Sequence, residues 1–502
     1  MNFNLQGEGC IEVEGVIVPV FEDGTLECLC EDVKDTINIF KEKGRFKGTK
    51  GEIYTFTKTS KDLMKEVILV GLGKKENLDG EDIRKVYSKA LRKAKELKLT
   101  ALGVKFFTIE GLCVKRVLKG IVEGMALGDY DFNKYKNSKE QCPIKDITIM
   151  GIGKQDIEAV NNALEESLAL VEATILARNL VNEPANIIYP ETLAKEAKKA
   201  GESHNFQVEV FDEKEIEALG MKAFLSVARG SVNSPRLIVM RYMGNEDNKE
   251  DILGLVGKGL TYDSGGYSLK PTDGMVTMKS DMGGAAAVIG AMCAIADMNL
   301  KANVIAVVAA CENMISGGAY KPGDIISTMA GKSIEVANTD AEGRLTLADA
   351  VYYAIDKEKV SKVVDIATLT GAVLVALGTT TTGVVTNNDE FYNVLQKASD
   401  ISGEKIWKLP AFDEYRELIK SDVADLKNVG GRMAGTVTAG LFIEEFIKDK
   451  KPWLHLDIAG TSWSDSDKNY LSKGATGVGV RTLYYLVREN GKIQKECGCQ
   501  DK

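Results

Sequence analysis

The sequence predicts an α/β protein of two domains: a smaller N-terminal α/β domain, and a larger C-terminal domain with a mixed, mainly parallel sheet flanked by helices. The first reason is length, because 502 residues exceed one ordinary core at about 100–200 residues per domain. The second is a regular alternation of short apolar runs with helical patterns. The third is a long helical pattern, from about residue 155 to 181, which ends before Pro184 and separates the two parts.

The N-terminal part alternates strands and helices. Residues 67–73 predict a short buried strand, and residues 82–97 predict a helix with apolar residues on one face and lysines on the other. No catalytic cluster is visible in this part. We therefore expect residues 1–160 to form a domain for support or oligomerisation, residues 161–182 to form a linking helix, and residues 183–502 to form a second, functional domain.

Apolar runs and helical periods alternate more clearly in the second domain. In a mainly parallel sheet of this kind ligands bind at the carboxyl ends of the strands, so functional residues should follow the strands directly. The predicted strands are 237–240, 252–256, 304–309, 334–337, 363–367 and 454–458, and the predicted helices are 285–297, 347–355, 391–399 and 438–446.

Composition excludes several classes of function. The chain has two histidines, His204 and His455, which nearly excludes an imidazole-built zinc site and argues against a histidine-based catalytic triad. His455 lies in an apolar run, so we expect a packed core residue. The net charge is −9 and no basic run of five residues occurs, which makes a nucleic-acid partner unlikely on this sequence.

The sequence also predicts a cytoplasmic location without a membrane partner. The N-terminus has no basic and apolar pattern of a signal peptide. The longest apolar stretch, residues 363–385, contains Asp365 and four consecutive threonines, so we interpret it as a buried strand plus a loop rather than a spanning helix. Nine cysteines form no C-x-x-C pair, and Cys497 and Cys499 are interpreted as part of a frayed terminus.

Four carboxylates of the second domain stand at glycine-flanked turns: Asp263, Asp281, Asp340 and Glu342. Asp263 lies in the segment that follows the strand 252–256, and Asp340 and Glu342 follow the strand 334–337. Glycine allows the backbone to approach a ligand closely. Asp281 precedes a predicted helix, whose N-terminal dipole favours the ionised carboxylate.

Each of these carboxylates alone is explained as a cap or turn residue, Asp281 as an N-cap and Asp340 as an Asx turn. Four of them at predicted strand ends, together with Lys258, Lys270 and Arg344, are not explained in this way. Oxygen-rich sites suit Mg²⁺, Mn²⁺ or Zn²⁺. Because one ion balances four carboxylates poorly, the sequence predicts two divalent ions.

At these segments the sequence resembles the leucine (cytosol) aminopeptidase family of dinuclear metallopeptidases. Asn-Thr-Asp-Ala-Glu-Gly-Arg-Leu at 338–345 matches the family signature at every position, and segments 258–266 and 278–284 match two further metal segments. The one departure is Tyr262, where the family more often has phenylalanine. The resemblance covers nearly all of the C-terminal two-thirds of the chain and is loose before it.

The resemblance implies a role for each matching residue. Asp263 and Glu342 would bridge the two ions, which would be Mn²⁺ or Zn²⁺. Lys270 and Arg344 would be the catalytic pair, with Arg344 holding a bicarbonate that moves the proton. The metal ligands implied are Lys258, Asp263, Asp281, Asp340 and Glu342.

The resemblance also implies the substrate and the assembly. The substrates would be peptides with a free N-terminus, preferentially with leucine or another apolar first residue, and the enzyme would be a homohexamer. Met278, Thr368 and Gly371 would line the pocket for the first side chain. From the residues alone, Met278 fits plain core packing equally well.

Elementary chemistry agrees with these roles. A lysine ligand must be neutral, and removing its proton at pH 7 costs roughly 4–5 kcal/mol from a pKa of about 10.4; two nearby cations and burial both reduce that cost at Lys258. Lys270 should stay protonated, because its charge would stabilise the developing gem-diolate. Arg344 is always charged and cannot itself be a base.

Two other functions remain as alternatives. Carboxylate-held metal pairs also cleave phosphate esters, so a dinuclear metal phosphoesterase is one of them. A lysine ligand and the scarcity of histidine argue against it. The other is an additional non-catalytic role in DNA binding, against which the acidic composition argues.

Overall fold

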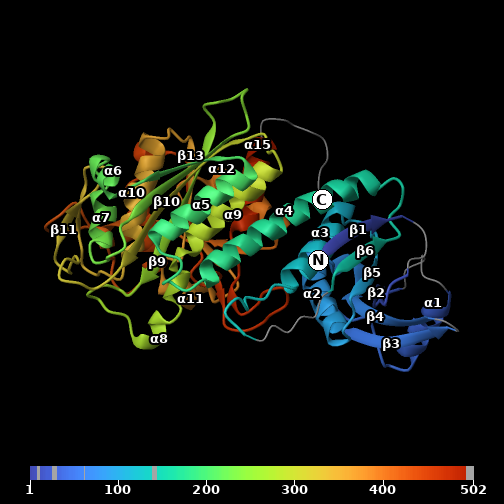
Figure 1. Cartoon of the computed structure of the whole chain (residues 1–502). Coiled ribbons are helices and arrows are strands. Elements are labelled where there is room, and N and C mark those ends of the chain that lie inside the picture. The colour runs from blue at the N-terminus through green and yellow to red at the C-terminus, as the bar shows by residue number, and fades with distance from the viewer. Residues whose placement is uncertain (8–11, 25–30, 61–62, 138–143, 493–502) are drawn as a thin grey trace. The chain divides into compact units, whose positions relative to one another are not determined.

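The computed structural model describes residues 1–7, 12–24, 31–60, 63–137 and 144–492 (Figure 1). They divide into two compact units. The N-terminal unit comprises Met1–Val171 and Ser466–Ser472, and the C-terminal unit comprises Glu172–Asp465 and residues 473–492. The division lies inside the long helix α4 (Ile157–Asn182). Nothing in the sequence pattern indicated that the short segment Ser466–Ser472 joins the N-terminal unit. Cys497 and Cys499 lie outside the described residues.

The N-terminal unit is built on a six-stranded sheet with the order β1-β6-β5-β2-β4-β3 (Figure 1). Its strands pair in parallel except β3, which is antiparallel to β4. Helices α2 and α3 pack against each other and contribute Tyr87 and Ile121 to the core. The elements are β1 (Asn2–Gln6), β2 (Gly15–Phe21), α1 (Glu31–Glu42), β3 (Ile53–Ser60), β4 (Leu63–Gly73), α2 (Gly80–Glu96), β5 (Ala101–Lys105), α3 (Val114–Gly128) and β6 (Asp146–Met150).

The C-terminal unit contains an eight-stranded mixed sheet with the order β15-β14-β17-β13-β9-β10-β8-β7. The central strands β17, β13, β9 and β10 are parallel, and β14, β8 and β7 add antiparallel pairs. The strands are β7 (Gln207–Phe211), β8 (Arg236–Met243), β9 (Ile252–Asp263), β10 (Asn303–Asn313), β13 (Lys362–Ala367), β14 (Thr382–Thr386), β15 (Ile406–Lys408) and β17 (Trp453–Asp457).

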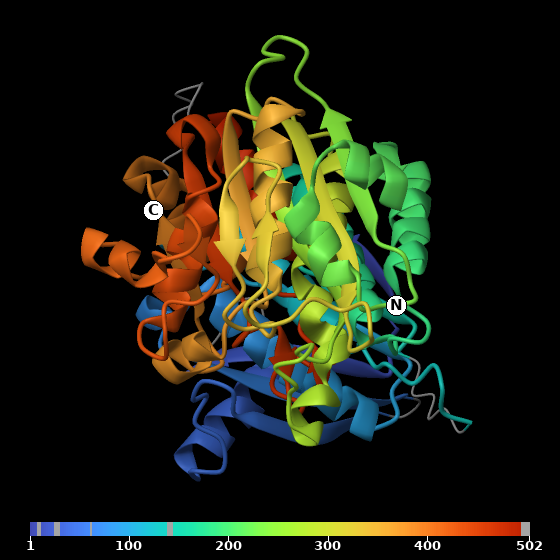
Figure 2. The ribbon, with the colours of Figure 1, turned by 90° about the vertical axis from the view of Figure 1, so that its left-hand side faces the viewer.

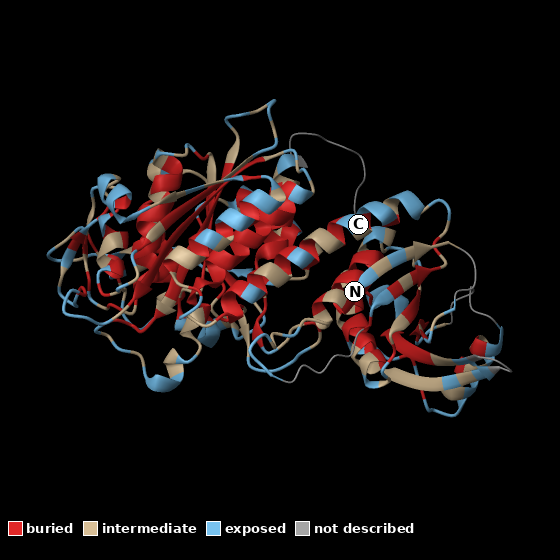
Figure 3. Ribbon diagram, in the orientation of Figure 1, coloured by how far each residue is buried: buried red, intermediate tan, exposed pale blue. Residues whose placement is uncertain are grey.

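Helices cover both faces of this sheet (Figure 2). β10 is buried at every position, as strands covered on both faces are (Figure 3). The helices are α5 (Pro190–His204), α6 (Glu213–Ala218), α7 (Lys222–Ala228), α8 (Thr272–Met275), α9 (Gly283–Asp297), α10 (Gly343–Asp356), α11 (Gly371–Leu377), α12 (Asp389–Ser402), α13 (Asp413–Arg416), α14 (Gly435–Glu444) and α15 (Val480–Lys492).

Short elements complete the C-terminal unit. The strands β11, β12 and β16 form a small sheet of their own, and β18 pairs with β19. Their bounds are β11 (Ile325–Ser327), β12 (Ser333–Glu335), β16 (Leu426–Lys427), β18 (Trp463–Ser464) and β19 (Gly474–Ala475), and the 3₁₀ turns are η1 (Lys75–Asn77, in the N-terminal unit), η2 (Met278–Met282), η3 (Glu417–Ile419) and η4 (Lys448–Lys450).

The predicted α/β class with a mixed sheet and flanking helices is confirmed, but three elements differ from the sequence pattern. β9 continues to Asp263 instead of ending near Val256. The run 334–337 belongs to the small sheet rather than to the main one. The stretch 363–385 contains the helix α11 between two strands, where only a loop was expected. Its sequence, Gly-Ala-Val-Leu-Val-Ala-Leu, is apolar throughout and so carries no helical period.

None of the helices in the described ranges is long and apolar enough to cross a membrane.

Candidate metal centre and active site

β9 carries the first two candidate residues, Lys258 and Asp263. Lys258 was expected directly after a strand, and it lies instead inside β9, paired in register with Ala309 of β10. The glycines that indicated the end of the strand, Gly257 and Gly259, are positions where neighbouring backbone lies close to β9. A Cβ on Gly257 would lie 2.7 Å from the Cα of Ala285 in α9, so glycine lets that helix pack directly on the strand.

Lys258 projects into a buried group of acceptors. Its Nζ lies 2.8 Å from Asp281 Oδ1 and 2.9 Å from Glu342 Oε1, and it donates to the main-chain oxygen of Thr368 at 2.9 Å. A Cβ on Gly343 would lie 2.4 Å from Lys258 Cε. Glycine at the start of α10 therefore makes room for the lysine side chain.

Asp263 ends β9, and the following loop turns back to bring Lys270 onto it. Gly265 and Gly266 have φ values of +85° and +62°, a region that favours glycine. A Cβ on Gly265 would also lie 2.8 Å from Asp340 Oδ1. Lys270 Nζ lies 2.8 Å from Asp263 Oδ2 and forms a close ion pair with Asp340. The turn therefore places one ammonium group against two candidate ligands, Asp263 and Asp340.

Asp281 lies in the 3₁₀ turn η2 directly before α9, close to the helix start that was expected. Its Oδ1 receives both Lys258 Nζ and the hydroxyl of Thr368, the latter at 2.8 Å. Its Oδ2 is buried and has no hydrogen-bond partner among the described residues. An N-cap carboxylate would accept from the helix N–H groups, and no such bond is formed here. Asp281 is therefore oriented toward the site rather than toward its own helix.

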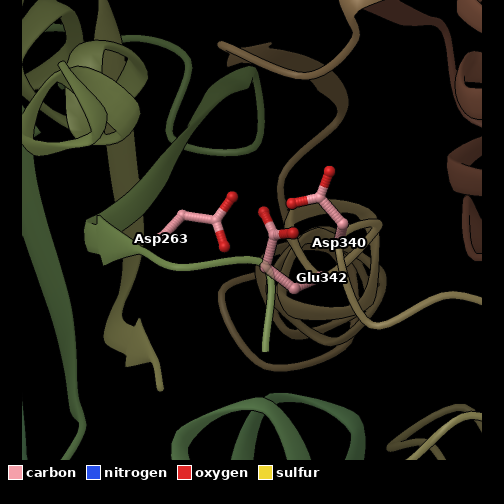
Figure 4. Close-up of side chains that lie close together, drawn as sticks. All are labelled: Asp263, Asp340 and Glu342. Carbon is pink, nitrogen blue, oxygen red and sulfur yellow. The ribbon is translucent and has the colours of Figure 1, made fainter. Parts of the chain in front are cut away.

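Asp340 and Glu342 come from the loop between β12 and α10, and their carboxylates converge with that of Asp263 (Figure 4). One oxygen from each of the three lies within 4.8 Å of the others. Glu342 is buried, whereas the side chain of Asp340 is one-third exposed at 33%. The three carboxylates therefore meet at a point that is open on the Asp340 side.

Burial and the charges of neighbouring side chains shift the pKa values of the carboxylates. Burial raises the pKa of Asp281 to about 8, although Lys258 opposes the shift. Burial, followed by the charge of Glu342, raises the pKa of Asp263 to about 6. Burial also opposes ionisation of Glu342, but Lys258 and Lys270 outweigh it and lower the pKa. The negative charge of the group is thus only partly compensated by protein cations.

The pKa of both lysines is raised. Burial alone would lower the pKa of Lys258, but the charges of Asp281, Glu342 and Asp263 outweigh it. The same balance holds for Lys270, where Asp263 and Glu342 outweigh burial. Among these neighbours both lysines are ammonium groups.

The residues fit divalent cations. Carboxylate oxygens are the ligands that Mn²⁺ and Mg²⁺ prefer, and Zn²⁺ also accepts them. Besides the three converging carboxylates, Asp281 Oδ2 and Glu342 Oε2 are buried acceptors without a partner in the described part of the chain. A buried carboxylate oxygen without a donor costs free energy, and a bound cation would remove that cost.

Arg344 lies at the start of α10 beside this centre. Its Nη1 donates to the main-chain oxygen of Asn428 at 2.8 Å, while its buried Nε has no partner among the described residues. Burial lowers the pKa of Arg344 to about 10, so it remains charged at neutral pH. The site therefore contains a fixed positive charge whose buried Nε–H is still available as a donor.

The three residues expected in the substrate pocket differ in how directly they contact the candidate ligands. Thr368, which follows β13, touches the centre directly through its bonds with Asp281 and Lys258. Met278 begins the 3₁₀ turn that carries Asp281. Gly371 is the first residue of α11, and a Cβ added there would meet no atom within 4 Å.

Two buried amides that hold the site were not predicted from the sequence. Asn428 accepts from the main-chain N–H of Ala337 at 2.8 Å and donates to the main-chain oxygen of Asn338 at 2.6 Å, which fixes the loop before Asp340. Asn313 binds Asp263 through its side chain. Both amides act across 25 or more positions in the chain, so no local motif could have indicated them.

His455 is fully buried, as expected of a core residue, but its polar contacts were not predicted. Its Nδ1 lies 2.5 Å from Asp365 Oδ1, and Trp453 Nε1 donates to the other oxygen of Asp365 at 2.6 Å. The negative charge of Asp365 outweighs burial and raises the pKa of His455. His204 is half-buried and lies 2.8 Å from Asp297, away from the candidate ligands.

Both parts of the chain match models of one protein family. Residues 175–484 match the catalytic domain of the cytosol aminopeptidase family, and residues 17–139 match its N-terminal domain. A probable cytosol aminopeptidase of Clostridium perfringens is 55% identical over 493 residues, which cover 98% of this chain and all of that protein. A probable cytosol aminopeptidase of Clostridium tetani is 49% identical over 91% of this chain and 94% of that protein.

Solved structures agree over nearly the whole length. A point variant of tomato leucine aminopeptidase superimposes with a TM-score of 0.87 at 33% identity, over 98% of this chain and 97% of that one. The bottromycin maturation enzyme BotP in complex with Mn superimposes with a TM-score of 0.85 at 30% identity, over 95% of this chain and 99% of that one. On the two family models and the full-length relatives, the chain belongs to the cytosol aminopeptidase family.

Proposed function

We propose that this chain removes leucine and other apolar residues from the N-termini of peptides, at a site that holds two divalent ions. The family makes the chain an aminopeptidase, which is a metal-dependent hydrolase of peptide bonds. The observation that carries the finer proposal is the convergence of Asp263, Asp340 and Glu342 within 4.8 Å, with buried acceptors of Asp281 and Glu342 still available.

Five residues are proposed as ligands. By the resemblance to the family, Asp263 and Glu342 would be ligands of both ions. Lys258 is an ammonium group among its present neighbours, but a divalent cation at the same carboxylates opposes that charge and favours the neutral amine. The proposed ligands are Lys258, Asp263, Asp281, Asp340 and Glu342.

Two divalent ions, when bound, supply a water of lowered pKa and polarise the scissile carbonyl. The other roles belong to the chain's own residues. Lys270 keeps its proton because neighbouring carboxylates raise its pKa, and its side chain is 18% exposed, so it can donate to a substrate oxygen that gains negative charge. Arg344 offers a fixed charge and the unused Nε donor to a small anion such as bicarbonate. That anion would supply the proton acceptor that arginine cannot be.

The preference for an apolar first residue rests on Met278, Thr368 and Gly371. Thr368 contacts the proposed ligand Asp281, so a side chain bound beside the ions would lie next to it. Gly371 leaves open space where another residue would project a Cβ. A methionine edge and an open glycine suit leucine or methionine side chains.

We also propose that the enzyme works in the cytoplasm as a homohexamer. The names of its relatives support the location, and the family resemblance of the sequence supports the assembly. Light scattering tests the assembly, because a hexamer has six times the 54.5 kDa mass of one chain. A monomeric mass would contradict it.

The activity is tested with two substrates and two metals. Metal-free protein is loaded with Mn²⁺ or Zn²⁺ and assayed with leucine anilide and with p-nitrophenyl phosphate, each with and without chelator. We expect chelator-sensitive release of the anilide and no phosphatase activity. Metal analysis of freshly purified protein identifies the ion carried. Phosphatase activity without amidase activity would favour a dinuclear phosphoesterase and contradict the proposal.

A further inference from the structure

A fully buried asparagine, Asn313, joins two of the proposed ligand segments. It is the last residue of β10 and pairs in register with Asp263, the last residue of β9. Its Nδ2 donates to Asp263 Oδ1 at 2.8 Å and to the main-chain oxygen of Thr339 at 3.0 Å. Thr339 directly precedes Asp340. One amide group therefore binds the chain at two proposed ligands, Asp263 and Asp340, which lie 77 residues apart in the sequence.

The chemistry of this position requires an amide. Both acceptors face the same nitrogen, and a primary amide has two N–H groups, one for each. A carboxylate of the same shape would instead place oxygen against the carboxylate of Asp263 and the carbonyl of Thr339. The backbone of Asn313 adds two further bonds, since its carbonyl accepts from Ser264 N at 3.0 Å and from Ser264 Oγ at 2.7 Å.

The bond to Asp263 also determines which of its oxygens faces the centre. Oδ1 accepts from Asn313 and from the main-chain N–H of Gly265, the latter at 2.8 Å. Oδ2 is the oxygen that meets Lys270. Two N–H donors on Oδ1 hold the plane of the carboxylate, so that Oδ2 keeps its direction toward the other ligands.

The second bond acts on the loop that carries Asp340. The main-chain oxygen of Thr339 accepts from the hydroxyl of Tyr320 at 2.8 Å as well as from Asn313. The side chain of Thr339 donates to the main-chain oxygen of Gly265 at 2.7 Å, and so binds the same loop that follows Asp263. A shift of Asn313 would therefore move both ligand segments.

We propose that Asn313 is a positioning residue of the metal centre, which fixes the orientation of Asp263 and its spacing from Asp340. The inference rests on the proposed function, because it gives Asn313 a role only if these carboxylates bind metal. Partners that orient metal ligands in this way typically contribute 10- to 100-fold to metal affinity or activity. We expect a loss of about that size when the amide is removed.

The test compares Asn313→Ala with Asn303→Ala. Asn303 lies at the other end of the same strand, is equally buried, and its Nδ2 likewise donates to two main-chain oxygens, of Asn245 at 3.1 Å and Asn248 at 2.8 Å. Mn²⁺ affinity is measured by titration calorimetry on metal-free protein. We expect a 10- to 100-fold weaker affinity and a lower kcat for Asn313→Ala, with KM little changed. Asn303→Ala should bind Mn²⁺ like the wild type even if its unfolding midpoint falls.

Asn313→Ser keeps the test decisive if the alanine variant does not fold. The serine hydroxyl stops about one bond length short of both acceptors and has one O–H in place of two N–H groups, so the same loss of Mn²⁺ affinity is expected. Wild-type affinity and kcat in a folded Asn313 variant would overturn the inference. An equal loss in Asn303→Ala would overturn it too, because the effect would then belong to the strand. If the wild type itself bound neither Mn²⁺ nor Zn²⁺, the proposed function would fail instead.

Discussion

Replacing Lys258 by methionine should destabilise the metal-free C-terminal unit. The ammonium group lies 2.8 Å from Asp281 and 2.9 Å from Glu342, and all three side chains are at most 6% exposed. Methionine matches the length and volume of the lysine stem, so little cavity is created. The substitution therefore isolates the loss of the charge.

The size of the effect follows from the environment. Removing one partner of a buried ion pair costs about 3–5 kcal/mol, because the other charge stays buried without compensation. Asp281 limits this cost, since burial raises its pKa to about 8 and it takes up a proton readily near pH 7. The remaining cost falls mainly on Glu342, which is ionised. We therefore expect about 3 kcal/mol at pH 7, the lower end of the range.

Tryptophan fluorescence measures the loss of unfolding free energy in the C-terminal unit, where Lys258 lies. The three tryptophans, Trp407, Trp453 and Trp463, all lie in the C-terminal unit. With a urea dependence of roughly 3 kcal/mol per molar, the unfolding midpoint in chelator should fall by about 1 M. Lys332→Met is the matched control. Lys332 pairs with Glu445 at 2.6 Å near the surface, so its replacement should cost at most about 1 kcal/mol.

Two results would refute this reasoning. An unchanged midpoint for Lys258→Met in chelator would mean that the ammonium group does not compensate the buried carboxylates. An equal fall for Lys332→Met would mean that the assay reports any lost lysine. Added Mn²⁺ should raise the unfolding free energy of the wild type by about 2.7 kcal/mol at 100 times its Kd, and so raise its midpoint, because binding favours the folded state.

Three further predictions concern other residues. Asp340→Asn should lower the metal bound per chain in elemental analysis, whereas Lys270→Ala should keep the metal and lower kcat about 100-fold or more; equal metal loss in both would mean that ligand and catalyst are confused. Burial raises the pKa of Asp349 from 3.8 to about 7 against three backbone N–H bonds, so its contribution to stability is lost as the pH rises through 7. In urea unfolding between pH 5 and 8, the wild type should lose about 3 kcal/mol relative to Asp349→Asn, nearly all of it below pH 7, and parallel pH curves would contradict this. Gly371→Ala should leave the midpoint unchanged, because the added Cβ meets no atom within 4 Å, while KM rises for leucine substrates more than for alanine substrates; equal KM changes would remove Gly371 from the pocket.

The convergence of the carboxylates could be predicted because the information is local. Asp340 and Glu342 stand two positions apart beside glycine, and Asp263 ends a strand before a double glycine. Glycine at turns and the chemistry of carboxylates were enough to indicate a metal site. The structure brings one oxygen from each of the three within 4.8 Å of the others, and their role as ligands stays a prediction.

The extent of β9 could not be predicted, because a glycine can either end a strand at a turn or lie within a strand where a neighbouring segment packs closely. In a sequence, Gly257 and Gly259 indicate the end of a strand. In the fold, Gly257 lies against α9, and a Cβ on Gly259 would lie 2.9 Å from the main-chain oxygen of Ala309. Strand glycines that admit a neighbouring backbone differ from turn glycines only in what surrounds them, and that is set by tertiary packing.

The roles of the two amides that hold the site, Asn313 and Asn428, could not be predicted for a related reason. Asn313 reaches Thr339 across 26 positions, and Asn428 reaches Asn338 across 90. An asparagine in a sequence most often indicates a turn or a cap. Here both asparagines satisfy main-chain groups of the ligand loops, a use that appears only when distant segments are adjacent.

Charge balance connects the scarcity of histidine to the proposed two-ion chemistry. Four ionised carboxylates and two ammonium groups leave a net charge of minus two in a largely buried space. Burial opposes that charge and raises the pKa of Asp263 and Asp281. A single divalent ion would neutralise the group only while Lys258 keeps its proton; with Lys258 neutral as a ligand, one ion would leave a net charge of minus one. A second ion, with Lys258 neutral as a ligand, would make the net charge plus one. Such a centre would favour an anion as the proposed nucleophile, and Arg344 adds a further positive charge beside it. A neutral imidazole ligand would supply none of the negative charge that lets two ions lie side by side, so the four carboxylates suit the proposed two-ion arrangement and leave no need for histidine.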